Sequence, residues 1–143
     1  MKAFFRLFLS LFVWLYQRTN GKIGGAIQGL PVLLLTTTGR KTGKKRVTPL
    51  GYFEQDGYYV ITASNAGADT HPAWFHNLKN QPQVTLQILD KQLTAMAEQA
   101  NPTLRKQLWA KLIERAPGYA GYEKRTTREI PMVLLRPVSE KPS

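Results

Sequence analysis

Residues 33–77 read LLLTTTGRKTGKKRVTPLGYFEQDGYYVITASNAGADTHPAWFHN, and this stretch decides which fold the sequence predicts. An apolar run ends in three threonines and a glycine. A basic loop follows, in which five of the seven residues 40–46 are Arg or Lys. A second apolar run, 47–54, is joined to a third, 58–64, by Asp56 and Gly57. Because Asp-Gly between apolar runs is a strong hairpin signal, we predict a strand, a basic loop and a β-hairpin.

The far end of the hairpin carries a second polar loop, residues 64–67, and a predicted helix over 73–80 follows with Trp74 near its start. Glycines in the basic loop expose backbone N–H groups, and Arg and Lys form charge-assisted bonds to phosphate or carboxylate. We interpret the two loops as neighbours at strand ends that form a pocket for an elongated anion. An aromatic side chain beside them suits a flat, conjugated ligand with a charged tail. A solvated turn or a nucleic-acid patch is the alternative interpretation of the loop.

The composition limits the class of protein. The 143 residues fit one domain, and 43% hydrophobic content is that of a globular chain. A net charge of +11 favours a nucleic acid, an anionic membrane surface or a polyanionic small ligand as partner. The absence of cysteine excludes a disulfide framework, a thiolate zinc site and a cysteine nucleophile. It is compatible with a reducing compartment, and we expect a cytoplasmic protein.

The chain divides into an apolar helix over 1–20, a glycine-rich linker over 21–30 and a body over 31–143. The apolar run in the first segment is shorter than the about 20 residues that a membrane span needs. One interpretation is a helix packed on the body or on a second copy. The other is an interfacial helix that binds anionic lipid on the cytoplasmic face of the membrane through residues 1–18.

The remaining patterns complete the predicted fold. Alternating apolar residues predict strands over 84–88 and from 91 to 97, and Asn101-Pro102 starts an amphipathic helix. The last strand covers 130–136. Since hairpins dominate over β-helix-β units, the sequence predicts an α+β fold: a mainly antiparallel split β-barrel of about six strands, with the N-terminal helix and two further helices.

Several common catalytic arrangements are not supported. The acidic residues are scattered and do not pair for acid–base catalysis. His71 and His76 lie five positions apart without acidic or cysteine neighbours, so we predict no metal site. Ser64, His71 and Asp69 form no triad signature, because nothing resembles a nucleophile elbow.

Two motifs, TTGRKTG before residue 44 and P-x-W-x-x-N-L from Pro72 to Leu78, resemble those of the deazaflavin-dependent nitroreductase family in the split β-barrel superfamily. The likeness covers residues 24–136. It implies a reductase that uses coenzyme F420, a deazaflavin whose side chain carries a phosphate and an oligoglutamate tail. The reduced coenzyme would pass a hydride to a conjugated acceptor: a quinone, an enone or a nitroaromatic. We favour a quinone or another lipophilic acceptor, with nitroaromatics as adventitious substrates.

The resemblance also implies roles for individual residues. It assigns the phosphate and acidic tail to Arg40, Lys41, Thr42 and Arg46. It assigns the deazaflavin ring to Pro49, Thr62, Ala63, Ser64 and Asn65, with Ala73 and Trp74 closing over it. It assigns the acceptor to Tyr52, Ser64, Tyr119 and Tyr122, with Ser64, Tyr119 and Tyr122 as candidate catalytic hydrogen-bond or proton donors. Asn65 and His71 depart from the residues frequent in the family, which leaves the acceptor contacts open.

Two alternatives remain at this point. A redox protein on the same barrel could use FMN, although a long cationic groove exceeds what its short phosphate needs. A nucleic-acid or lipid-surface binding module would use the charge directly. Because the charges cluster in one loop without a ladder of exposed aromatic residues, we expect no nucleic-acid partner. The sequence is consistent with a monomer or a homodimer.

Overall fold

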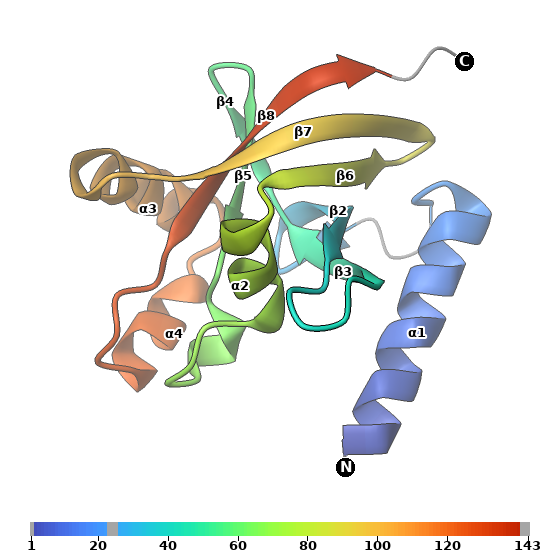
Figure 1. Ribbon diagram of the computed structural model, residues 1–143. Coiled ribbons are helices and arrows are strands. Elements are labelled where there is room, and N and C mark those ends of the chain that lie inside the picture. Colours follow the sequence, from blue (N-terminus) through green and yellow to red (C-terminus); the bar gives the residue numbers. More distant parts are fainter. Residues whose placement is uncertain (1, 23–25, 141–143) are drawn as a thin grey trace.

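The computed structural model describes residues 2–22 and 26–140, and within these ranges the chain forms an eight-stranded antiparallel sheet and four α-helices (Figure 1). The helices are α1 (Lys2–Thr19), α2 (Ala73–Asn80), α3 (Pro102–Arg115) and α4 (Tyr119–Arg125), with one 3-10 turn, η1 (Asn65–Gly67). The strands are β1 (Ala26–Ile27), β2 (Leu30–Thr38), β3 (Lys45–Gly51), β4 (Phe53–Gln55), β5 (Tyr58–Thr62), β6 (Gln83–Ile88), β7 (Lys91–Gln99) and β8 (Met132–Glu140).

The sheet follows the order β1-β2-β6-β7-β8-β5-β4, and β3 also pairs with β2. This confirms the predicted α+β class and the antiparallel pairing. The sheet is not closed into a barrel, since no ladder in the described residues joins β3 to β4 or β5. The strand predicted over 47–54 is divided at Tyr52, whose N–H leaves the ladder and donates to the Pro31 carbonyl at 2.9 Å. This division and the short strand β1 raise the strand count above the predicted six.

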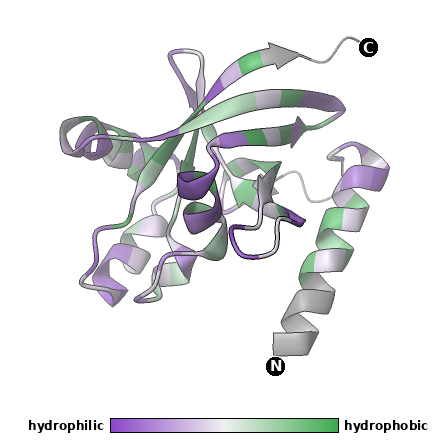
Figure 2. Cartoon of the chain, viewed as in Figure 1, coloured by the Kyte–Doolittle hydropathy of each residue, from purple (hydrophilic) through white to green (hydrophobic). Residues whose placement is uncertain are grey.

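Two strands carry near-continuous apolar runs because both of their faces are buried. Leu33 and Leu35 of β2 point into an inner core, which α2 covers with Trp74 and Phe75. The alternate residues of β2, Val32 and Leu34, instead pack against α1. The strand β8 alternates in the same way between the inner core and an outer core beneath α3 and α4. Figure 2 shows the hydrophilic loop that follows the apolar strand β2.

The local signals of the sequence produce the expected turns and caps. Asp56 and Gly57 both have positive φ, 52° and 83°, in the hairpin between β4 and β5. Asn101 caps α3, where its side-chain oxygen accepts a hydrogen bond from the Leu104 N–H at 2.8 Å. The helix over 73–80 is found with the predicted bounds, after Pro72 and before Pro82.

The helix α1 lies along the outer face of the sheet beside β2 and β3 (Figure 1). Tyr16 fixes it there: its side chain is fully buried, and its hydroxyl donates to the Val32 carbonyl at 2.8 Å and accepts from the Leu89 N–H at 2.9 Å. Leu11 and Trp14 are each 53% exposed. No helix in the described part of the chain is long and apolar enough to cross a bilayer.

Two features differ from the predicted organisation. Residues 119–125, which carried no helix prediction, form α4, because burial of Tyr119 in the outer core outweighs the low helix propensity of Gly121. Within the predicted linker over 21–30, Ala26 and Ile27 pair with β2. Residues 23–25 of that linker lie outside the described ranges.

Candidate functional site

The basic loop between β2 and β3 is a closed turn held by its own backbone. The Gly39 N–H donates to the Lys44 carbonyl, and the Gly43 N–H donates to the Gly39 carbonyl, both at 2.8 Å. Gly43 has φ 73°, a conformation that favours glycine. Thr42 Oγ1 accepts a hydrogen bond from the Lys44 N–H at 3.2 Å. Two main-chain bonds and one bond to the Thr42 hydroxyl therefore hold the turn, and none of the three uses a cationic side chain.

Asn77 of α2 fastens this loop to the inner core. Its side chain is 6% exposed, its Oδ1 accepts from the Arg40 N–H at 3.1 Å, and its Nδ2 donates to Thr37 Oγ1 at 3.3 Å. No role for Asn77 was predicted from the sequence. The P-x-W-x-x-N-L motif contained the signal, because it places Asn77 one helical turn after Trp74.

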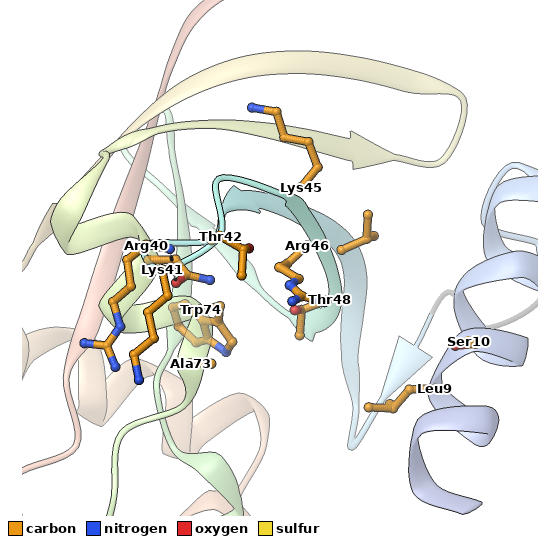
Figure 3. Close-up of a pocket in the computed structure, with 13 residues that line it drawn as sticks. Leu9, Ser10, Arg40, Lys41, Thr42, Lys45, Arg46, Thr48, Ala73 and Trp74 are labelled. Carbon is orange, nitrogen blue, oxygen red and sulfur yellow. Dashed lines mark hydrogen bonds between the residues drawn. The ribbon is translucent and has the colours of Figure 1, made fainter. Parts of the chain in front are cut away.

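A cleft of about 850 Å³ opens between the loop, α2 and α1 (Figure 3). The loop and β3 line it with Arg40, Lys41, Thr42, Arg46, Val47 and Thr48. Gly39 and Lys45 also border it, and α2 contributes Ala73, Trp74 and Asn77. Figure 3 shows Leu9 and Ser10 of α1 on one side, Arg40, Lys41 and Trp74 on the other, and Arg46 and Thr48 between them.

The electrostatics of the cleft suit an anion. Four cationic residues line it, and no carboxylate is among its described lining residues. Lys45 differs from the others, since its Nζ donates to Thr38 Oγ1 at 2.9 Å. The Trp74 side chain is 6% exposed and lines the cleft together with the cations. The donor set fits a ligand that carries phosphate or carboxylate groups next to a planar ring.

The structure brings six of the predicted site residues into this cleft: Arg40, Lys41, Thr42, Arg46, Ala73 and Trp74. The remaining ones lie outside its lining: Pro49, Tyr52, Thr62, Ala63, Ser64, Asn65, Tyr119 and Tyr122. Pro49 is on β3, close in sequence to lining residues, and Thr62 ends β5. The strands that precede the two polar loops, β2 and β5, are not paired neighbours, because β6, β7 and β8 separate them in the sheet.

The three candidate tyrosines have different surroundings. Tyr52 is buried in the inner core against the edge of Tyr59, and burial together with the Glu54 charge raises its pKa to about 12. Burial also raises the pKa of Tyr119, in the outer core, above the usual tyrosine value. Tyr122 packs edge-on against Tyr119, and its hydroxyl accepts from Gln28 Nε2 at 2.6 Å.

His71 has a structural partner instead of a metal ligand set. Its Nδ1 lies 2.9 Å from Arg128 Nη1. Burial and the positive charge of Arg128 lower the pKa of His71. The described residues contain no cluster of three or more His, Cys, Asp or Glu side chains that could hold a metal ion. No local sequence pattern indicates the role of Arg128, which is 57 positions away from His71.

A smaller groove of about 260 Å³ continues from the cleft between α1 and β3. Its lining combines the apolar residues Leu9, Val13, Trp14 and Val47 with the polar residues Ser10 and Gln17, and Leu9, Ser10 and Val47 also belong to the cleft. The cationic cleft therefore continues on one side into a groove in which most of the lining residues are apolar.

Three comparisons with known proteins match most of the chain to F420H2-dependent reductases. A family profile described as F420H(2)-dependent quinone reductase matches residues 8–137. The F420H(2)-dependent quinone reductase Rv1261c of Mycobacterium tuberculosis is 41% identical over 125 residues, which cover 85% of this chain and 84% of the relative. A solved F420-H2 dependent reductase (FDR-A) is 39% identical with a TM-score of 0.68, and the match covers 74% of this chain and 94% of the other. A solved structure described as a domain-swapped dimer is 34% identical with a TM-score of 0.70, and the match covers 94% of this chain and 98% of the other.

Proposed function

The chain belongs to the F420H(2)-dependent quinone reductase family, and from this membership we propose that it reduces a quinone with the hydride of reduced coenzyme F420. The coenzyme, when bound, supplies the hydride, and the acceptor takes up that hydride and one proton to become a hydroquinone. The protein binds and orients both molecules and keeps water from the reacting atoms.

The cationic cleft is the observation that carries this proposal. Arg40, Lys41 and Arg46 line the cleft, no carboxylate is among its described lining residues, and the three cations complement the phosphate and the oligoglutamate tail of the coenzyme. The Thr42 hydroxyl is a further hydrogen-bonding group at that end. FMN has no polycarboxylate tail, so some of these cationic side chains would have no anionic group to bind.

The ring of the coenzyme would lie toward Trp74 and Ala73 at the start of α2. We assign its other contacts to Pro49 and to the segment 62–65, which includes Thr62, Ala63, Ser64 and Asn65. An aromatic wall and short side chains allow a flat ring to approach the backbone closely. This assignment predicts that bulky substitutions at Ala73 obstruct the ring while the cationic end still binds the tail.

For the proton and the acceptor contacts, we assign Ser64, Tyr119 and Tyr122 as hydrogen-bond or proton donors and Tyr52 as an aromatic contact. Burial raises the pKa values of Tyr52 and Tyr119, so both phenols are neutral at physiological pH and are weaker acids than an exposed tyrosine, which suits hydrogen-bond donation better than proton transfer. A neutral phenol can donate a hydrogen bond to the oxygen on which charge develops. Enones and nitroaromatics, which also accept a hydride, are secondary acceptors in this proposal.

The apolar groove between α1 and β3 supports a lipophilic acceptor. Val13, Trp14 and Val47 line a channel that joins the cationic cleft, so an acceptor with an apolar tail could place its head at the ring and its tail along α1. A hydrocarbon tail gains free energy from each methylene group that it removes from water. Short soluble quinones should therefore be reduced with a higher KM than quinones with a tail.

The exposed face of α1 supports peripheral contact with a membrane. Leu11 and Trp14 project into solvent, and the nearby Arg18 guanidinium lies 5.6 Å from the Trp14 ring centroid. Apolar side chains flanked by cations favour the interface of an anionic bilayer. We place the protein on the cytoplasmic face of the membrane. Trp14 fluorescence should shift to the blue with anionic vesicles, and a spectrum unchanged by them would remove this part of the proposal.

The solved relative that forms a domain-swapped dimer supports a homodimer for this chain as well. Light scattering of the purified protein distinguishes the dimer from a monomer.

Steady-state turnover tests the proposed activity. Reduced F420 is mixed with the protein and a tailed quinone, and oxidation of the coenzyme is followed by absorbance. We expect turnover with reduced F420 and none with reduced FMN. Turnover with reduced FMN alone would move the chemistry to ordinary flavin redox, and turnover with soluble enones but not with quinones would replace the proposed acceptor.

A further inference from the structure

Arg128 lies in the segment between α4 and β8. Its guanidinium forms hydrogen bonds with four acceptor atoms in the segment 63–71. Nη2 donates to the carbonyls of Ala63 at 3.2 Å and Ser64 at 2.8 Å. Nε donates to the Ala68 carbonyl at 2.8 Å, and Nη1 lies 2.9 Å from His71 Nδ1. Arginine offers five N–H donors in one rigid plane, which lysine cannot reproduce.

The contact with Arg128 determines which ring nitrogen of neutral His71 carries the proton. Because a guanidinium only donates, His71 Nδ1 must accept, and the ring proton of neutral His71 is on Nε2. The charged or titratable groups near this ring are Arg128 and His76, and both disfavour a second proton on His71. Asp69, which accepts from Thr126 Oγ1 at 2.9 Å, interacts with Arg128 from the other side.

The residues that Arg128 holds lie between two parts of the proposed site. Ala63 and Ser64 follow β5, and His71 comes two residues before Ala73, the first residue of α2 and part of the cleft wall. Between them, Asn65 and Ala66 have φ values of 48° and 53°. Two successive non-glycine residues in the left-handed region need support from their surroundings. The bonds to the carbonyls of Ser64 and Ala68 flank this turn on both sides.

We propose that Arg128 is a positioning residue, which sets the segment 63–71 and the start of α2 in the geometry that the deazaflavin ring requires. This inference rests on the proposed function, because the ring is assigned to that function's site. Arg128 does not line the cleft and acts through Ser64, His71 and the α2 residues that follow.

The first test compares variants with equal loss of charge. Arg128→Gln and Arg136→Gln each remove one positive charge, and Arg136 is an exposed residue of β8 that the proposed site does not use. Arg128→Lys keeps the charge but cannot reach all four acceptors. We expect both Arg128 variants to weaken F420 binding or lower kcat about tenfold or more, since misplaced reacting groups are costly, while Arg136→Gln stays near the unmodified protein. Equal behaviour of Arg128→Gln and Arg136→Gln would overturn the proposal.

The second test reads the His71 ring directly by nitrogen NMR and does not depend on turnover. In the unmodified protein, we expect a neutral ring with its proton on Nε2, and a proton on Nδ1 would overturn the inference. In Arg128→Gln, the pKa of His71 should rise toward the ordinary value of about 6.5, and F420 binding should gain a pH dependence there. Adding His71→Asn should abolish that dependence. If the unmodified protein bound no F420, the proposed function would fail, whereas the NMR result would still decide whether Arg128 holds His71.

Discussion

Asn77 is the residue through which the inner core determines the shape of the cationic loop. Its amide joins the Arg40 N–H and the Thr37 hydroxyl from a position where it is almost inaccessible to water. Thr37 lies near the end of β2, and Arg40 lies in the loop that follows and is one of the cations that line the cleft. The amide therefore links the stability of the fold to the geometry of the site.

Replacement of Asn77 by Leu should lower the free energy of unfolding by about 1–3 kcal/mol, because it leaves buried polar partners without hydrogen bonds. F420 binding should weaken in parallel, since the loop loses its anchor. Urea unfolding and a fluorescence titration measure the two effects. Asn80→Leu, at the exposed end of the same helix, is the matched control. A loss of stability with unchanged F420 affinity would show that the loop keeps its shape without Asn77.

Tyr52 makes the stability of the protein depend on alkaline pH. Burial and the Glu54 charge raise its pKa to about 12, above the ordinary value of 10.0. Folding therefore favours the protonated phenol, so this contribution is complete below pH 10 and is lost as pH rises from 10 to 12. Urea unfolding across this range should show a smaller decline in Tyr52→Phe than in the unmodified protein. Parallel curves for the two proteins would contradict the raised pKa.

The chemistry of the cationic loop could be predicted from the sequence because it depends on adjacent residues. Arg40, Lys41 and Arg46 share one turn, and their charge needs no distant partner. The roles of Asn77 and Arg128 could not be predicted in this way, since their partners lie 37 to 65 positions away along the chain. The assignments of Ser64, Tyr119 and Tyr122 remain predictions.

At the scale of elements, α1 is attached to the sheet through one buried hydroxyl and a small apolar contact. Tyr16 reaches the Val32 carbonyl and the Leu89 N–H, while Phe12 and Val13 pack beside it. The same helix forms one wall of the cationic cleft and one wall of the apolar groove. Its attachment therefore determines the width of both.

Tyr16→Phe should loosen α1, because it removes the acceptor of the Leu89 N–H and the donor to Val32. We expect a loss of about 1–3 kcal/mol in the free energy of unfolding and faster hydrogen exchange in the described part of α1. Tyr58→Phe is the control, since the Tyr58 hydroxyl makes no hydrogen bond in the described structure. Equal exchange in the two variants would mean that packing alone retains α1.

The helices and strands could be predicted where turn and helix-cap residues mark their ends. Asp56-Gly57 and Asn101-Pro102 set a turn and a helix start through local backbone preferences. The helix α4 was not predictable, because Gly118 and Gly121 argue against a helix, whereas the contacts that favour it, such as the burial of Tyr119, are tertiary. The open sheet also could not be predicted from the sequence. Closure depends on whether β3 pairs with β5, and no local sequence pattern indicates that pairing.

At the scale of the whole molecule, four of the twenty Lys and Arg residues line one cleft, and no carboxylate is among its described lining residues. The mostly apolar groove continues from this cleft along α1. In the proposed function, the cationic end of this layout binds the cofactor tail and the mostly apolar end binds the acceptor. Binding of a polyanionic tail should weaken with rising salt, because exposed charges are screened.

A fluorescence titration with coenzyme F420 measures whether this cleft binds the coenzyme through its cations. The variants to compare are Arg40→Ala/Lys41→Ala and the control Lys106→Ala/Lys124→Ala, which removes the same charge from the exposed surfaces of α3 and α4. We expect tight binding by the unmodified protein and by the control, and binding about 100-fold weaker in the cleft variant, since each lost charge-assisted bond contributes about 1.5 kcal/mol or more. Equal affinities in the two double variants, or preference for FMN in a parallel titration, would contradict this expectation.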